Sequence, residues 1–135
     1  MILTPPAVPS GDDDGYLSAA EIAQLRLNAD WVLLSACNTA AADGTPGAEG
    51  LSGLAKSFIY AGSRSLLVSH WPIASEATVP LTTWMLHEYA TQPAAGKAAA
   101  LRKAMLALMD TPGHPEYAHP FFWAPFVLVG EGGRR

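Results

Sequence analysis

Three short, uninterrupted apolar runs constrain the fold of this 135-residue chain more than any other feature. The runs Trp31–Leu34, Ser65–Val68 and Phe126–Val129 show no alternation of apolar and polar residues. A strand that is buried on both faces of a sheet gives this pattern. We therefore predict three buried strands, and a composition that is 50% hydrophobic and 15% charged supplies enough apolar material to cover them.

Segments with helical spacing separate the predicted strands. Ser18 and Glu21 form a capping box that opens the first helix, with Ile22 and Leu25 on one face and an end near Asn28, a residue that tolerates a left-handed C-cap. Three more helices are expected: from Leu51 to about Phe58 with Gly62 as its cap, from about Thr78 to Ala90 with Pro80 near the first turn, and from Lys97 to Met109.

This order of elements predicts an α/β domain. We expect part of a doubly wound, mostly parallel sheet with about three strands and four helices, followed by a flexible tail over residues 131–135. The net charge of −4 and the lack of a basic cluster exclude a nucleic-acid footprint, and no apolar stretch is long enough for a membrane span. A single cysteine, Cys37, excludes an internal disulfide and fits a cytoplasmic location.

Residues Ser10–Glu21 imitate a calcium-binding loop, with Gly15 at loop position six and Glu21 at position twelve. The first position is a serine instead of an aspartate, and the prolines before it cannot form the entering helix. A polar turn followed by a capping box explains the same residues. We therefore expect neither a metal nor a cofactor.

Cys37 lies just past the first predicted strand, at the end where parallel sheets collect functional groups. A cysteine at this place either acts as a nucleophile or simply packs, and its position alone does not decide between the two. Asp43 and Glu49 lie in the loop that follows. They either bind a basic substrate side chain or remain solvated loop charges.

Four ordered blocks of the chain strongly resemble the CHAT family. They are residues 14–30, residues 34–58 with LSACNT and GAEGLSGLAKSF, residues 61–73 with AGSRSLLVSHWPI, and residues 119–130 with HPFFWAPFVLVG. The resemblance implies a fold like that of caspases, separases and gingipains. It also implies a Cys/His dyad with Cys37 as the nucleophile, a peptide or protein substrate, and association with tetratricopeptide repeats, which often accompany the family in bacteria.

The chain departs from the family at the histidine, which the family carries upstream of its cysteine. Here His70, His87, His114 and His119 all follow Cys37. We therefore expect residues 1–135 to form the C-terminal portion of a CHAT domain without its upstream histidine strands, a portion of an endopeptidase that is inactive without that segment. His70 is the candidate substitute base, because it ends the strand after the cysteine strand.

The resemblance also implies that Ser69 and Trp71, on either side of His70, contribute to substrate binding. The alternative is a non-catalytic scaffold or interaction module. In that case the strand Trp31–Leu34 exposes an edge that pairs with a second copy and gives a homo-oligomer. The reactivity of Cys37 distinguishes the two hypotheses, because an activated thiol alkylates fast at neutral pH and a packed thiol does not.

Overall fold

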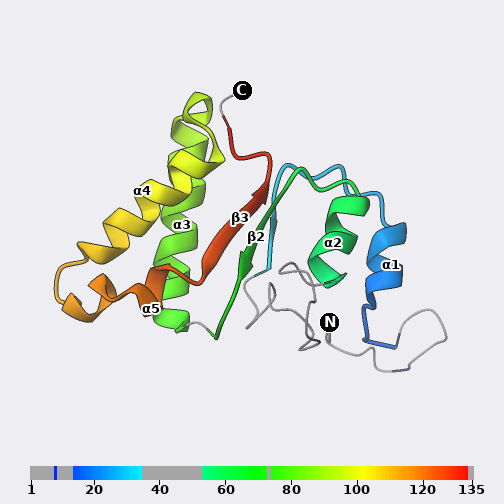
Figure 1. Cartoon of the computed structure of the whole chain (residues 1–135), viewed down its shortest axis with the longest axis horizontal. Coiled ribbons are helices and arrows are strands. Elements are labelled where there is room, and N and C mark those ends of the chain that lie inside the picture. The colour runs from blue at the N-terminus through cyan, green and yellow to red at the C-terminus, as the bar shows by residue number, and fades with distance from the viewer. Residues whose placement is uncertain (1–7, 9–13, 35–52, 73, 134–135) are drawn as a thin grey trace, which may run out of the picture.

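A three-stranded sheet forms the centre of the domain (Figure 1). The computed structural model describes residues 8, 14–34, 53–72 and 74–133. The strands are β1 (Val32–Leu33), β2 (Ser65–Ser69) and β3 (Phe126–Gly130), in the order β1-β2-β3. They coincide with the three apolar runs, so the predicted α/β class with three strands is confirmed.

The sheet is mixed, because β1 runs parallel to β2 while β3 runs antiparallel to it. The reason is the pair of helices α3 (Ser75–Thr91) and α4 (Lys97–Met109) between β2 and β3. One helix carries the chain back along the sheet, and the second returns it to the carboxyl end of β2 (Figure 1). The apolar pattern of β3 predicts its burial but not its direction, so the expectation of a mostly parallel sheet fits only the β1–β2 pair.

Helices cover both faces of β2, whose five residues are all buried. Leu67 points to the core that α3 and α4 cover. Its neighbours Leu66 and Val68 point to the opposite core, which contains residues of α1 (Ala19–Gln24) and α2 (Gly53–Tyr60). This arrangement confirms that the unbroken apolar run reflects burial on both sides.

The capping box at the start of α1 is present. The Glu21 amide donates to the Ser18 hydroxyl oxygen (3.2 Å), and the Ser18 amide donates to the Glu21 carboxylate (2.7 Å). The helix ends at Gln24, so the predicted end near Asn28 is wrong, and Leu25, which was expected on the same helix face as Ile22, is the C-cap residue and is 40% exposed. Asn28 has a φ of 42°, which confirms its left-handed conformation.

The other helices follow the sequence pattern, except that α3 starts earlier than predicted and three short elements are additional. α4 has the predicted bounds, whereas α3 begins at Ser75, so Pro80 is its sixth residue and lies beyond the first turn. No side chain caps α3, which explains why the sequence gives no signal for its start. Three short elements were not predicted: the 3₁₀ helices Pro93–Ala95 and Pro115–Ala118, and the helix α5 (Pro120–Trp123).

A buried lysine joins the three strands at one end of the sheet. Lys97 is 3% exposed, and its Nζ donates to the Asp30 carbonyl (2.7 Å) and to the Ser65 Oγ (2.7 Å). Ser65 Oγ in turn donates to the carbonyl of Glu131, just beyond β3 (2.7 Å). The ammonium also lies 5.4 Å from the centre of the Trp31 ring, a cation–π contact.

The segment after β3 packs closely on the start of α4. The carbonyl of Gly132 accepts from the Ala98 amide (3.0 Å). Gly96 has a φ of 87°, and a Cβ at this position would lie 2.5 Å from the Gly133 carbonyl oxygen. Glycine is therefore required at residue 96, both for the backbone conformation and for the close approach of the C-terminal segment.

Replacing Lys97 by methionine should destabilise the domain by about 1–3 kcal/mol, because the buried Ser65 hydroxyl and the partly buried Asp30 carbonyl lose a charged donor. Lys103→Met on the same helix is the matched control. Lys103 is 43% exposed and pairs with Glu88 on the surface, so its loss should cost less than about 1 kcal/mol. Urea denaturation measures both, and equal losses in the two variants would contradict a structural role for Lys97.

The capping box predicts a pH-dependent contribution to stability. Hydrogen bonds from the backbone and the side chain of Ser18 lower the pKa of Glu21 from its ordinary 4.5. The stabilisation is therefore complete at neutral pH and is lost as the pH falls through the lowered pKa. Glu21→Gln, which removes the carboxylate that accepts from the Ser18 amide, should lower the stability at pH 7, and its difference from wild type should narrow in acid. Ser75→Ala, at a helix start without a side-chain cap, should show no such narrowing in urea titrations.

Candidate functional site

The carboxyl end of β2 carries three residues that the sequence marks as candidates. Ser69 is the last residue of the strand and is fully buried. His70 follows with an exposed side chain, and Trp71 is half-buried. The backbone here is fixed, because the His70 amide donates to the carbonyl of Pro125 just before β3 (3.0 Å). His70 is thus presented to solvent from an anchored backbone.

The parallel pairing of β1 with β2 brings the ends of both strands to the same side of the sheet. Val32 pairs with Leu66 and Leu33 with Leu67, and the Leu34 amide continues the ladder by donating to the Leu67 carbonyl (2.8 Å). We call this edge, where the chain leaves β1 after Leu34 and β2 after Ser69, the rim. Cys37 comes three residues after Leu34 in the sequence. Cys37, Asp43 and Glu49 lie outside the described residues.

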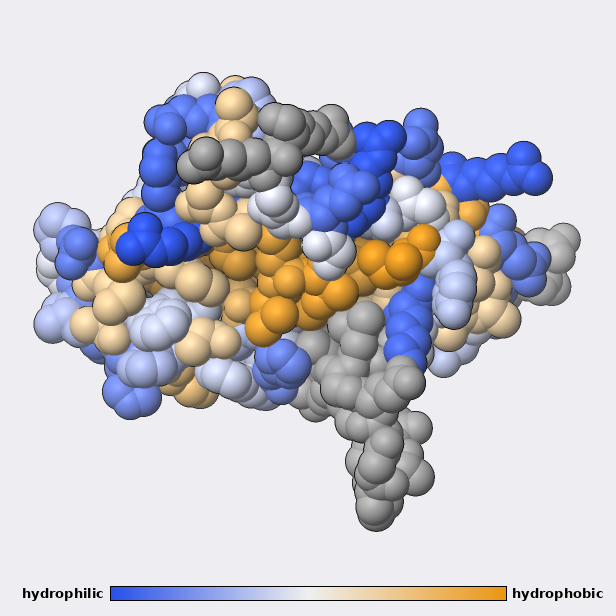
Figure 2. Space-filling model, turned by 45° about the horizontal axis from the view of Figure 1, so that its top comes forward, coloured by the Kyte–Doolittle hydropathy of each residue, from blue (hydrophilic) through white to orange (hydrophobic). Residues whose placement is uncertain are grey.

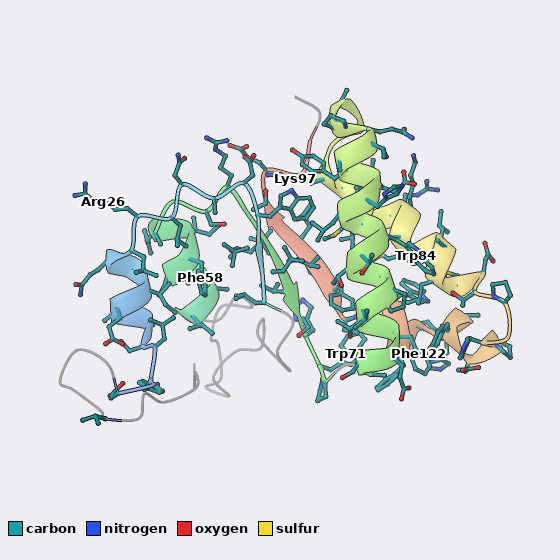
Figure 3. The ribbon with its side chains drawn as sticks, turned by 180° about the vertical axis from the view of Figure 1, so that it is seen from behind. Arg26, Phe58, Trp71, Trp84, Lys97 and Phe122 are labelled. Atoms are coloured by element: carbon teal, nitrogen blue, oxygen red, sulfur yellow. The ribbon has the colours of Figure 1, made fainter. Side chains whose placement is uncertain are left out.

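An aromatic group from α5 lies beside the end of β2. The Trp71 indole N–H donates to the carbonyl of Phe121 (3.2 Å), and Figure 3 shows Trp71 and Phe122 at the same end of the molecule. The Phe121 ring is 46% exposed and stands perpendicular to the ring of Phe122, with centroids 5.3 Å apart. Sequence reasoning missed the position of Phe121. The available signal was His119-Pro120, a capping residue followed by a proline suited to a first helical turn.

The remaining histidines serve local structure. His119 caps α5, since its Nδ1 accepts from the Phe121 amide (3.2 Å). His114 stacks on Tyr117 with centroids 4.6 Å apart and lies 2.9 Å from the Glu116 carboxylate. This hydrogen bond from His114 lowers the pKa of Glu116. His87 is exposed on α3. His70 is therefore the histidine that the described structure places at the rim.

The described part of the chain contains no group of three or more histidine, cysteine, aspartate or glutamate residues arranged to hold a metal ion. Within the same residues, none of the helices combines the length and the apolar character needed to cross a membrane. The chemical group that the rim offers is the exposed imidazole of His70, which follows the end of β2 and precedes Trp71.

The described structure is a helix-covered α/β sheet in which the cysteine-bearing segment follows β1 in the sequence and His70 follows β2. The family model for the CHAT domain matches residues 2–131. The chain therefore belongs to the CHAT domain family, which is caspase-like, and the resemblance seen in the sequence is confirmed.

Two curated relatives are tetratricopeptide repeat proteins. The chain is 31% identical over 116 residues to tetratricopeptide repeat protein 28 of Mus musculus and 29% identical to the Homo sapiens protein of the same name. Each match covers 84% of this chain but only 4% of the relative. The chain thus corresponds to a small part of these proteins. No solved structure matches.

Proposed function

We propose that this chain supplies the nucleophile of a CHAT-type cysteine endopeptidase, with Cys37 as nucleophile and His70 as the base available within the chain. The observation that carries the proposal is the parallel register of β1 and β2. Both strands end at the rim, where the side chain of His70 is exposed and where the chain leaves β1 three residues before Cys37. The match of residues 2–131 to the CHAT family supports the same assignment.

The chemistry follows from these two groups. A free thiol is mostly protonated at neutral pH, because its pKa is about 8.5. An imidazole within hydrogen-bond reach accepts the thiol proton, and the thiolate attacks the carbonyl carbon of a peptide bond. The C–N bond breaks as the imidazolium returns the proton to the leaving amine. Water then hydrolyses the thioester and regenerates the thiol.

The surroundings of the dyad set the substrate class in this proposal. Asp43 and Glu49, on the loop after Cys37, bind a basic side chain of the peptide. Trp71 forms a wall of the binding site, and Ser69 supports it from the interior. No cofactor is required, because the thiol, the imidazole and water account for every bond that forms and breaks.

The alternative is a non-catalytic module that associates through its sheet edge. Within the described residues β2 is the sole neighbour of β1, whose two residues are only half-buried. Figure 2 shows a continuous hydrophobic band across one face of the molecule. An open strand edge favours pairing with another chain, and an exposed apolar surface favours association. Because the relatives are tetratricopeptide repeat proteins, a repeat of that type is the second candidate partner.

The alkylation rate of Cys37 by iodoacetamide from pH 5 to 9 tests the catalytic proposal. We expect a midpoint clearly below the ordinary thiol pKa of about 8.5, because an imidazole stabilises the thiolate. In His70→Ala the midpoint should return toward the ordinary value. His87→Ala, which removes an exposed histidine on α3, should leave the profile unchanged. A slow, unshifted profile in all three proteins would exclude a His70 dyad and favour the scaffold.

Self-association through β1 predicts a specific pattern of amide protection. Successive amides along a strand point in opposite directions, and the Leu34 amide faces β2, so the Leu33 amide faces the open edge. Sedimentation velocity should show a dimer that forms with rising concentration, and hydrogen exchange at Leu33 should slow in parallel. A monomer at all concentrations, or a dimer without protection of Leu33, rules out pairing through this edge.

A further inference from the structure

Helix α3 has two apolar faces. Its inner face belongs to the core through Ala77, Leu81 and Met85, each 0% exposed. The opposite face carries Val79, which is 65% exposed, and Leu86, which is 42% exposed. In Figure 3, α3 lies in front of the sheet and of α4, so this outer face is turned to the viewer. A surface helix needs one apolar stripe to cover the core, and the second stripe therefore requires an explanation.

The residues of the outer face have the spacing of a helix–helix contact. Val79, Thr83, Leu86 and Ala90 follow one another at intervals of four, three and four residues, and all of them are exposed. We call these residues the outer stripe. Because a helix turns by about 100° per residue, they lie within a sector of about 60°. Residues that alternate in this way form the seam between two packed helices.

The outer face of α3 is also poor in charge. Glu76 is the only exposed residue of α3 with a formal charge, whereas the shorter helix α4 exposes both Arg102 and Lys103. Three threonine hydroxyls of α3 donate to carbonyls one turn earlier: Thr78 to Ala74, Thr82 to Thr78 and Thr91 to His87. These hydroxyls are thus satisfied within the helix. Depletion of charge distinguishes the centre of a protein interface from the rest of the surface.

We propose that the outer stripe binds the outer stripe of a second copy of this chain, with the two α3 helices antiparallel about a two-fold axis. The alternation of large and small residues favours this partner. In the antiparallel register, Val79 lies opposite Ala90 of the partner copy, and Leu86 lies opposite Thr83 of the partner copy. Every layer then combines a large residue with a small one. A parallel register would place two leucines in one layer and two alanines in another, which close packing disfavours.

The charges at the ends of the stripe agree with the antiparallel register. Glu76 lies one turn before Val79, so it comes opposite the end of the partner helix near Gln92. At that end, Lys103 Nζ lies 3.2 Å from the Gln92 side-chain oxygen. The register therefore brings a carboxylate toward an ammonium group, whereas a parallel register would bring two Glu76 carboxylates together.

The size of α3 determines how strong this dimer can be. The helix has 17 residues and is about 25 Å long at 1.5 Å per residue. One such helix from each copy gives an interface at the low end of the usual size range, so we expect a dimer that dissociates on dilution. The inference is independent of the proposed catalytic function and of the β1 edge, because neither contributes a residue to the outer stripe.

Sedimentation velocity over a range of concentrations tests the pairing. Leu86→Glu places a carboxylate in the middle of the stripe and should weaken dimerisation about tenfold or more, as expected for a central apolar contact. Leu25→Glu is the matched control, because Leu25 is 40% exposed but follows α1, on the other side of the sheet. It should leave dimerisation unchanged. A wild type that stays monomeric, or a dimer that persists equally in Leu86→Glu, overturns the proposal.

Disulfide cross-linking tests the register. Cys37 is the single cysteine of the chain, so Cys37→Ser gives a background without thiols. In this background, a mixture of Val79→Cys and Ala90→Cys chains should form a mixed disulfide in oxidised glutathione, because the two positions face each other. Val79→Cys alone should not cross-link, since its two copies lie roughly 16 Å apart along the helix axis and a disulfide joins Cα atoms less than about 7 Å apart. Absence of the mixed disulfide, or equal cross-linking of Val79→Cys with itself, overturns the antiparallel pairing.

Discussion

Complete burial of β2 is the constraint on which the rest of the domain depends. Leu66, Leu67 and Val68 are each at most 2% exposed, so helices must cover both faces of the sheet. The strand also begins and ends with buried serines, and a buried hydroxyl requires a hydrogen-bond partner. For Ser65 the partners are Lys97 and the carbonyl of Glu131. The need to satisfy this polar end within an apolar core explains why a lysine is placed inside the molecule.

The position of the rim follows from the same strand. Once β2 is fixed, its pairing with β1 determines where both chains leave the sheet, and its pairing with β3 brings Pro125 and α5 next to His70. The rim is therefore assembled by the two neighbours of one central strand. The parallel neighbour, β1, precedes Cys37 in the sequence. The antiparallel neighbour, β3, is preceded by the aromatic residues of α5.

The sequence predicts best the features that depend on local pattern. The apolar runs located all three strands, and Ser18 with Glu21 located the start of α1. The pattern failed where tertiary contacts decide: Leu25 became exposed because α1 ends early, and Lys97 is buried because its partners come from residues 30 and 65, far away in the sequence. The structure describes the exposure of His70, whereas the roles of Cys37, Asp43 and Glu49 remain predictions. Phe121 was missed because its importance arises from a contact with Trp71, fifty positions earlier.

The placement of Lys97 at one end of the sheet and Trp71 at the other divides the molecule into two regions (Figure 3). Ser65 and Ser69 are separated by four residues of extended chain, about 13 Å at roughly 3.3 Å per residue. Substitutions so far apart, with no shared partner, usually have additive effects on stability. Rim residues can therefore diverge between homologues while the lysine end preserves the fold. In such a family the surface of the rim changes readily while the architecture stays constant.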